Sequence, residues 1–335
     1  MANITFFELE EFGLENKKNY IKSKLKGHTV SFIPKRLEHE TAKLARNANA
    51  AAFFIYSHID AALLKKLPKL KLVTTMSTGF DHIDIAACKK RKVVACNVPS
   101  YGENTVAEHA MALLLAISRN IVPSVERTRK GKFSFDGLRG FDLKGKTIGI
   151  LGTGKIGKHM AHYARAFGMN VLAYDLFSNK ALAQECGFTY TSLSELLKKS
   201  DIISLHLPET PKTHHIINSQ NLKKIKKGCI LINTARGGLA ETEALLAGIK
   251  NGTFRALGLD VLEEEAQLQE EAILLNKKNY NAQLLLEEHA LQGMENVLIT
   301  PHNAFNSDEA LQRILDTTLD NILAFLKKKP QNVIK

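Results

Sequence analysis

Three segments in the C-terminal half of the sequence place polar side chains directly after short apolar runs. Residues 232–238 contain Arg236, residues 257–265 contain an aspartate and three glutamates, and residues 297–305 contain His302. An arginine at the end of a buried strand can bind a carboxylate through two parallel hydrogen bonds. A histidine titrates near neutral pH and can give or take a proton. These residue types suit a site that binds a carboxylate and transfers a proton.

A glycine-rich turn lies upstream of these segments. Gly152-Thr153-Gly154-Lys155-Ile156-Gly157 follows a predicted strand and opens a predicted helix, and Asp175 ends the next strand, 18 residues after Gly157. This is the full dinucleotide-binding fingerprint, in which free N–H groups at the helix start hold the pyrophosphate. A carboxylate at Asp175 can accept hydrogen bonds from ribose hydroxyls and would repel a 2′-phosphate. The pattern therefore predicts binding of NAD rather than NADP.

The elements that position these residues alternate between strands and helices, which is typical of parallel sheets covered by helices. Thr105 and Glu108 form a capping-box pattern that predicts the start of an apolar, buried helix. Residues 266–295 interrupt the alternation with a charged segment that we interpret as a helical excursion. The predicted strands are residues 51–56, 71–76, 93–96, 147–151, 171–174, 202–205, 229–233, 256–260 and 297–300. The other predicted helices include residues 61–67, 155–167, 242–250 and 308–327.

The amino-acid composition limits the classes of protein to which the chain can belong. A chain of 335 residues with 44% hydrophobic and 24% charged residues is typical of a globular protein of about two domains. Its formal charge of +12 is compatible with nucleic-acid binding or with an enzyme for small anions, and the charge alone does not decide between them. The four cysteines are widely spaced, which predicts buried free thiols in the cytoplasm and neither disulfides nor a metal site. The longest apolar run is too short to span a membrane.

Four motifs in one order resemble the D-isomer-specific 2-hydroxyacid dehydrogenases over nearly the whole chain. They are the glycine loop, the NTARGG strand end, the LDVLEEE segment and the TPH strand end. The resemblance implies two doubly wound α/β domains with parallel sheets: a Rossmann NAD-binding domain, residues 101–301, inserted into a flavodoxin-like substrate domain, residues 1–100 and 302–335. It further implies a homodimer, because the apolar helix after Thr105 is similar to the segment through which family members form dimers.

The resemblance also assigns roles to residues. Arg236 matches the arginine that binds the substrate carboxylate and polarises the carbonyl, His302 matches the acid/base, and Glu265 matches the glutamate paired with it. The neighbouring Glu263 and Glu264 are expected to face solvent. Substrate-binding positions are expected at Tyr56, Thr78, Gly79, Tyr101 and Phe305. Cofactor-binding positions are expected at Val106, Gly152, Gly154, Lys155, Ile156, Gly157, Asp175, Leu207, Pro208, Thr213, Thr234, Ala235 and Asp260.

This reading predicts reduction of a small 2-oxo acid with NADH, and an aromatic Phe305 favours pyruvate over larger substrates. The alternatives left open are a glyoxylate/hydroxypyruvate reductase, a broader 2-oxo acid reductase, and a non-catalytic NADH-sensing corepressor on the same scaffold. Family members often carry proline after the catalytic glutamate, whereas Ala266 stands here and weakens the substrate assignment. Neither a nucleic acid nor a membrane is expected as a partner. His206, His214 and His215 are expected to pack or face solvent without a metal.

Overall fold

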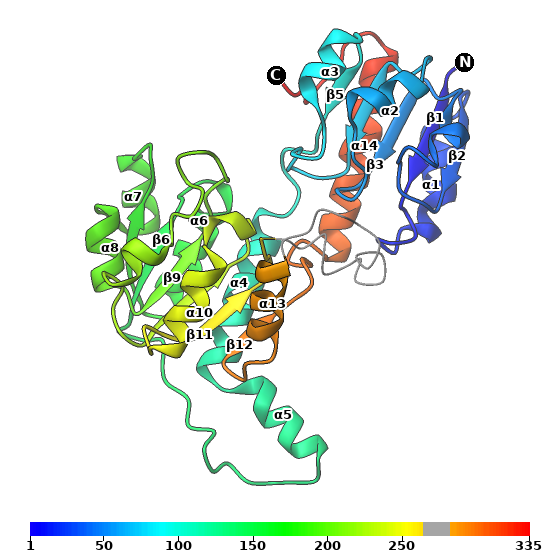
Figure 1. The fold of residues 1–335 in the computed structure, drawn as a ribbon. Helices are drawn as coiled ribbons and strands as arrows, with labels where there is room; N and C mark the ends of the chain where they lie inside the picture. The colour runs from blue at the N-terminus through cyan, green and yellow to red at the C-terminus, as the bar shows by residue number, and fades with distance from the viewer. Residues whose placement is uncertain (264–281) are drawn as a thin grey trace. The chain divides into compact units, whose positions relative to one another are not determined.

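The computed structural model describes residues 1–263 and 282–335. The chain divides into two compact units, each built on a parallel β-sheet (Figure 1). The first unit comprises residues 1–102 and 306–335, and the second comprises residues 103–305. Two parallel-sheet α/β units confirm the predicted fold class.

The first unit contains a five-stranded sheet in the order β2-β1-β3-β4-β5, with every neighbouring pair parallel. Its strands are β1 (Asn3–Phe7), β2 (Thr29–Ile33), β3 (Ala50–Phe53), β4 (Leu72–Thr75) and β5 (Val94–Cys96). Its helices are η1 (Glu15–Lys17), α1 (Lys18–Lys24), η2 (Ala42–Ala45), α2 (Ala61–Lys66), α3 (Ile85–Lys90) and α14 (Asp308–Leu326).

Helix α14 covers the first sheet from the C-terminal end of the chain. The side chain of Ser307 caps its start by accepting a hydrogen bond from the N–H of Ala310. Its buried residues recur at the three- and four-residue spacing of one helix face, and the helix packs against β4. Asn321 on that face is fully buried and donates to the carbonyl of Asn97, 2.9 Å away, just after β5.

The second unit contains a seven-stranded parallel sheet in the order β12-β11-β10-β9-β6-β7-β8. Its strands are β6 (Thr147–Leu151), β7 (Asn170–Tyr174), β8 (Thr189–Tyr190), β9 (Ile202–Leu205), β10 (Cys229–Asn233), β11 (Phe254–Leu259) and β12 (Val297–Ile299). Its helices are α4 (Glu103–Ser118), α5 (Ile121–Arg129), α6 (Lys155–Ala166), α7 (Lys180–Cys186), α8 (Leu193–Lys199), α9 (Ser219–Leu222), η3 (Gly237–Leu239), α10 (Thr242–Lys250) and α13 (Ala282–Gln292).

The apolar helix expected after Thr105 is α4, and it packs against α6, β10 and β11. It starts at Glu103, two residues before the predicted boundary, so Thr105 lies inside its first turn and the predicted capping box is wrong. Glu108 instead accepts a hydrogen bond from the side chain of Asn104, 3.1 Å away. The close approach of α4 to the sheet requires Gly258, because a Cβ there would lie 3.2 Å from that of Leu113.

The N-terminal strands correct the sequence prediction most. Strands β1 and β2 were not predicted, although β1 lies inside the first sheet. Strand β3 ends at Phe53 rather than at Tyr56, which places Tyr56 in the loop after the strand. Of the predicted helical excursion at residues 266–295, the described part contains α13, and residues 266–281 lie outside the described residues.

Helix α5 and the segment that follows it lead away from the seven-stranded sheet of their unit (Figure 1). Their surface carries apolar side chains: Ile121 and Val125 are about half exposed, and Phe133 and Phe135 are almost fully exposed. No single helix among the described residues is long and apolar enough to cross a membrane. The bent pair α4–α5 passes that test on length and composition alone.

Candidate active site

The glycine loop joins β6 to α6 at the carboxyl edge of the seven-stranded sheet. Gly152 has φ +96°, and a Cβ there would lie 2.6 Å from the carbonyl of His206 at the end of β9. A Cβ on Gly157 would lie 1.9 Å from the carbonyl oxygen of Gly152. Both positions therefore exclude any larger residue. A Cβ on Gly154 would meet nothing within 4 Å, which leaves open space at the N-cap of α6.

This open space belongs to a cavity of about 420 Å³ at the start of α6. Three groups from α6 line it, Lys155, Lys158 and His159, together with Glu103 of α4, whose carboxylate lies 3.4 Å from the Lys155 ammonium. Basic side chains beside free helix N–H groups attract an anion such as a pyrophosphate.

Asp175 follows β7, as predicted, and its carboxylate reaches back to the glycine loop. Its Oδ2 accepts hydrogen bonds from the backbone N–H and the hydroxyl of Thr153, at 2.7 and 2.9 Å. The same hydroxyl lies 2.7 Å from the hydroxyl of Tyr190 on β8. The carboxylate is thus fixed beside the glycine loop, where a ribose hydroxyl would meet a negative charge.

Further polar atoms lie unpaired at this edge of the sheet. The Nδ1 of His206, the hydroxyl of Thr234 and the amide oxygen of Asn303 are buried and have no hydrogen-bond partner among the described residues. Burial lowers the pKa of His206 to about 4, so its imidazole is neutral at pH 7. Three buried, unpaired polar atoms after β9, β10 and β12 fit a site that a polar cofactor completes.

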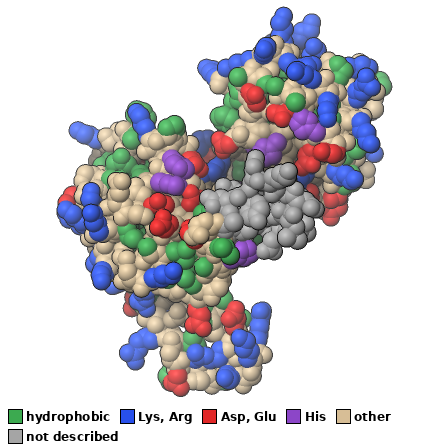
Figure 2. Space-filling view, viewed as in Figure 1, with side chains coloured by type: hydrophobic (Ala, Val, Ile, Leu, Met, Phe, Trp, Pro, Cys, Tyr) green, Lys and Arg blue, Asp and Glu red, His purple; other side chains and the backbone are tan. Residues whose placement is uncertain are grey.

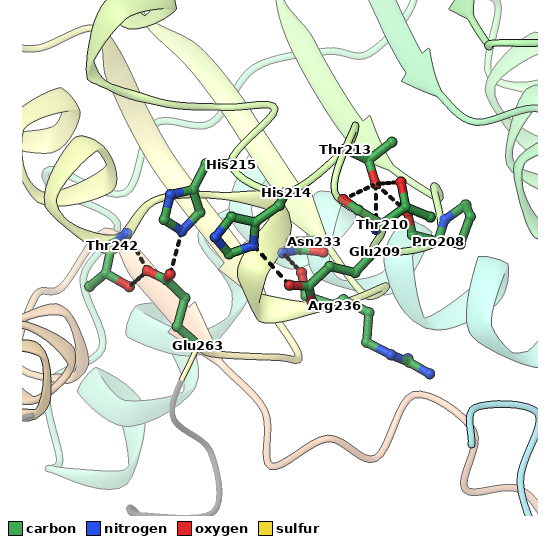
Figure 3. Close-up of polar contacts among 10 residues, drawn as sticks. All are labelled: Pro208, Glu209, Thr210, Thr213, His214, His215, Asn233, Arg236, Thr242 and Glu263. Atoms are coloured by element: carbon green, nitrogen blue, oxygen red, sulfur yellow. Dashed lines mark hydrogen bonds and ion pairs between the residues drawn. The ribbon is translucent and has the colours of Figure 1, made fainter. Parts of the chain in front are cut away.

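Thr213, expected to contact the cofactor, uses its hydroxyl within its own loop. The hydroxyl donates to the carbonyl of Pro208 at 2.6 Å and accepts from the N–H of Thr210 at 2.8 Å (Figure 3). These bonds close the turn that follows Leu207.

Arg236 lies after β10, in a turn that Asn233 shapes. Buried Asn233 donates to the carbonyl of Arg236 at 2.8 Å and accepts from the N–H of Ala235 at 3.1 Å. The guanidinium of Arg236 donates to the carbonyl of Ala235, and Figure 3 shows it directed away from Glu263 and His215. Gly237 follows because a Cβ there would lie 2.0 Å from the carbonyl oxygen of Leu262. The turn therefore fixes the backbone from which the arginine side chain extends.

Asp260 organises the loop that carries His302. It follows β11 and is 1% exposed, and its carboxylate accepts three hydrogen bonds: from the hydroxyl of Thr300 at 2.5 Å and from the N–H groups of Asn303 and Ala304 at 3.0 and 2.9 Å. Its carbonyl accepts the N–H of His302 at 2.9 Å. His302 has φ +49°, in the left-handed region that a non-glycine residue occupies only when its surroundings hold it there.

His109 of α4 extends this network, which the sequence did not predict. Its Nε2 lies 3.0 Å from the Thr300 hydroxyl and 3.5 Å from Oδ1 of Asp260. Because the one hydroxyl hydrogen of Thr300 points to Asp260, the imidazole must donate to the threonine oxygen. A chain of donors therefore runs from His109 through Thr300 to Asp260.

Glu263 does not face solvent as predicted. Its Oε1 accepts from Nε2 of His215 at 2.6 Å, and its Oε2 accepts from the N–H and the hydroxyl of Thr242 at 2.7 and 2.6 Å (Figure 3). His215 stacks on His214, which in turn contacts Glu209 at 2.9 Å. These contacts form only because three loops meet in space, so no spacing of residues in the sequence predicts them. Glu264 and Glu265 lie outside the described residues.

In the first unit, the expected substrate positions follow three neighbouring strands at their carboxyl ends. Tyr56 is half-buried after β3, its ring covered by the Arg36 guanidinium at 4.7 Å. Thr78 and Gly79 follow β4, and the Thr78 hydroxyl donates to the carbonyl of Val98 at 2.8 Å. Tyr101 follows β5, and its carbonyl accepts a hydrogen bond from Arg313 of α14.

Glu8 is a buried acid at the same edge that the sequence did not indicate. It is fully buried after β1, with φ +63°. One carboxyl oxygen accepts from the N–H of Phe54 and the hydroxyl of Ser57, both at 2.8 Å, and the other has no partner among the described residues. Burial is the main cause that raises the pKa of Glu8 to about 7.

Known proteins resemble this chain over most of its length. A family model described as "D-isomer specific 2-hydroxyacid dehydrogenase, NAD binding domain" matches residues 111–304. D-lactate dehydrogenase of Escherichia coli K12 is 36% identical over 300 residues, covering 88% of this chain and 89% of that protein. Glycerate dehydrogenase of Methylorubrum extorquens AM1 is 39% identical over 281 residues, covering 82% of each.

A solved structure is also similar. The crystal structure of D-lactate dehydrogenase from Aquifex aeolicus, complexed with NAD and lactic acid, superposes with a TM-score of 0.87 at 36% identity. The match covers 98% of this chain and 96% of that one.

Proposed function

This chain belongs to the D-isomer-specific 2-hydroxyacid dehydrogenase family and is an NAD-dependent enzyme, and we propose that it reduces pyruvate to D-lactate. Two similar proteins named D-lactate dehydrogenase support this substrate. The similarity to a glycerate dehydrogenase supports hydroxypyruvate or glyoxylate as the alternative.

One observation carries the proposed mechanism: the buried carboxylate of Asp260 holds the loop that presents His302. Reduction of a 2-oxo acid requires a hydride at the carbonyl carbon and a proton at the carbonyl oxygen. NADH, when bound, supplies the hydride. In our proposal His302 gives the proton, and Glu265 stabilises the protonated imidazole that precedes that transfer.

Arg236 is proposed to bind the substrate carboxylate and to stabilise the negative charge that develops on the carbonyl oxygen. The turn built by Asn233 supports this role, because it fixes the backbone from which the guanidinium extends. A planar, permanently charged group suits both tasks without a change in protonation.

Cofactor binding is proposed for the remaining expected residues at the carboxyl edge of the seven-stranded sheet. The open N-cap at Gly154 and the lysine beside it would hold the pyrophosphate, and Asp175 would accept the ribose hydroxyls. The unpaired hydroxyl of Thr234 would gain a partner from the cofactor. Val106, Ile156, Leu207, Pro208, Thr213, Ala235 and Asp260 complete the proposed set.

The preference for a small substrate is assigned to aromatic side chains. Tyr56 and Phe305, both half-buried, are proposed to limit the space for the side chain of the 2-oxo acid, with Tyr101 contacting the substrate. Backbone N–H groups at Thr78 and Gly79 are proposed to bind its carboxylate.

The test is NADH oxidation by the purified protein with pyruvate, 2-oxobutyrate, phenylpyruvate, glyoxylate, hydroxypyruvate and oxaloacetate, repeated with NADPH. We expect the highest kcat/KM with pyruvate and NADH. If kcat/KM is highest with hydroxypyruvate or glyoxylate, the proposed mechanism stands and the proposed substrate is wrong. Turnover with NADPH at the NADH rate would contradict the role given to Asp175.

We further propose that the chain forms a homodimer and acts in the cytoplasm. The exposed Phe133 and Phe135 beyond α5 support a partner surface, since monomers rarely expose such side chains together. The four cysteines are all free and buried, as predicted, which supports a reducing compartment. Light scattering on the purified protein checks the first proposal, and a monomer at all concentrations would overturn it.

A further inference from the structure

A cluster of three metal-binding side chains lies on the outer helices of the second unit. His162 comes from α6, and Glu185 and Cys186 come from the last turn of α7, which packs against α6. One ligand atom from each residue lies within 4.8 Å of the other two, and Sγ of Cys186 lies 3.3 Å from Nε2 of His162. Among the described residues, no other group of three such side chains meets this distance.

The spacing of these atoms suits a tetrahedral ion. Zinc binds sulfur at about 2.3 Å and imidazole nitrogen at about 2.0–2.1 Å, so the two ligands are about 3.5 Å apart at a tetrahedral angle. The observed 3.3 Å between sulfur and nitrogen is within a few tenths of that edge. In the chain without metal, the same contact is a thiol–imidazole hydrogen bond.

The donor set and its burial point to the same ion. Thiolate and imidazole together select zinc over magnesium or calcium, which prefer oxygen. A thiolate, a carboxylate and a neutral imidazole carry two negative charges, so a divalent cation makes the site neutral. Cys186 is 3% exposed and Glu185 is exposed, so one side of the site stays open for entry and for a water ligand.

We propose that His162, Glu185 and Cys186 bind one zinc ion, with water as the fourth ligand. The ion would fasten the C-terminal end of α7 to α6, the helix that begins at the glycine loop. The sequence predicted no metal, because His162 lies 24 residues from Cys186 and no short ligand pair marks the site. Only the packing of α6 against α7 brings the donors together.

The experiment titrates the full-length, metal-free protein with zinc chloride against a chromophoric chelator and records the thermal unfolding midpoint. We expect one tightly bound zinc per chain and a rise of about 5 °C at a hundredfold excess over Kd. Cobalt chloride should give a thiolate-to-metal charge-transfer band, which a site without sulfur does not produce.

Four variants decide the assignment. Cys186→Ser should remove the charge-transfer band, and His162→Ala should lower zinc affinity at least tenfold. Glu185→Gln, at an exposed position that does not threaten folding, should weaken zinc binding while NADH still binds. Cys88→Ser, which removes another buried thiol on a short helix, should bind zinc like the parent. Absence of zinc binding in the parent, or equal affinity in all four variants, would overturn the proposal.

Discussion

Asp260 is the residue on which the geometry around His302 depends most. Its side chain satisfies two backbone N–H groups and one hydroxyl, and its backbone carbonyl holds the N–H of His302 itself. The backbone of His302 lies in the left-handed region, which a non-glycine residue occupies only when its surroundings hold it there. The network therefore fixes the backbone position of the proposed acid before any ligand arrives.

We predict that His302→Ala lowers kcat with pyruvate by at least about a hundredfold, because general acid catalysis contributes about that factor or more. NADH binding, measured by fluorescence, should stay within about twofold, since the proposed cofactor contacts lie elsewhere. His39→Ala removes an exposed histidine of the first unit and serves as the control. An unchanged kcat in the His302 variant would remove this residue from the mechanism.

Glu8 gives a prediction about pH and stability. Its pKa of about 7 in the folded chain lies above the ordinary 4.5, so the folded state holds the proton more tightly than the unfolded state. Stability from this group is therefore lost as pH rises from 4.5 to about 7, by roughly 2–3 kcal/mol between pH 5 and 8. Glu8→Gln mimics the protonated form and should flatten this loss.

Thermal unfolding of the parent and of Glu8→Gln at pH 5 and pH 8 checks this. The two midpoints should be similar at pH 5, and the variant should be the more stable protein at pH 8. Glu15→Gln, at an exposed position in η1, should leave the pH dependence unchanged. A Glu8→Gln protein that loses stability with pH as steeply as the parent would contradict the buried-acid interpretation.

At the scale of elements, two positions in the glycine loop allow folding and cofactor binding to be tested separately. Gly157→Ala places a Cβ 1.9 Å from a backbone oxygen and should lower the unfolding free energy by roughly 1–3 kcal/mol. Gly154→Ala meets no atom within 4 Å and should leave the unfolding midpoint unchanged. It should nevertheless weaken NADH binding roughly tenfold or more. The added methyl group would occupy the open N-cap of α6 and prevent hydrogen bonds between the helix N–H groups and the charged pyrophosphate.

Calorimetry for NADH and a thermal melt on both variants separate the two effects. If Gly154→Ala bound NADH as tightly as the parent, the pyrophosphate would not lie at this N-cap.

The loop after β12 gives the second element-scale prediction. Asp260→Asn replaces one acceptor oxygen with an amide, which turns a donor toward a backbone N–H that needs an acceptor. The loop should shift, and kcat should fall roughly ten- to a hundredfold, as for a misplaced catalytic group. Asp201→Asn, which also removes a carboxylate that accepts a backbone N–H, lies at the start of β9 and should leave kcat unchanged. Equal activity of both variants would contradict the positioning role.

The elements predicted correctly from the sequence are those with a strong local pattern of apolar and turn residues. Six of the seven strands in the second unit were predicted within two residues, because each is a short apolar run followed by turn residues, whereas the two-residue β8 was not predicted. Strands β1 and β2 were missed because charged or polar residues interrupt the N-terminal segment, and the partners that define the first sheet lie far along the chain. The contacts of His109 and Glu263 were missed for the same reason: they join elements that no local spacing relates.

At the scale of the whole molecule, the charge of +12 does not gather into one band on the visible face. Figure 2 shows Lys and Arg spread over both units and interspersed with Asp and Glu. The predicted family, fold class and use of NAD are confirmed by the similar proteins, whereas the substrate and the catalytic residues remain proposals. Glu265 stays a prediction, because it lies outside the described residues.

The configuration of the product distinguishes the proposed reaction from its alternatives. The purified protein is incubated with pyruvate and NADH, and the lactate formed is separated by chiral chromatography while NADH consumption is recorded. We expect D-lactate in a one-to-one ratio with the NADH oxidised. L-lactate, or bound NADH that no 2-oxo acid oxidises, would contradict it.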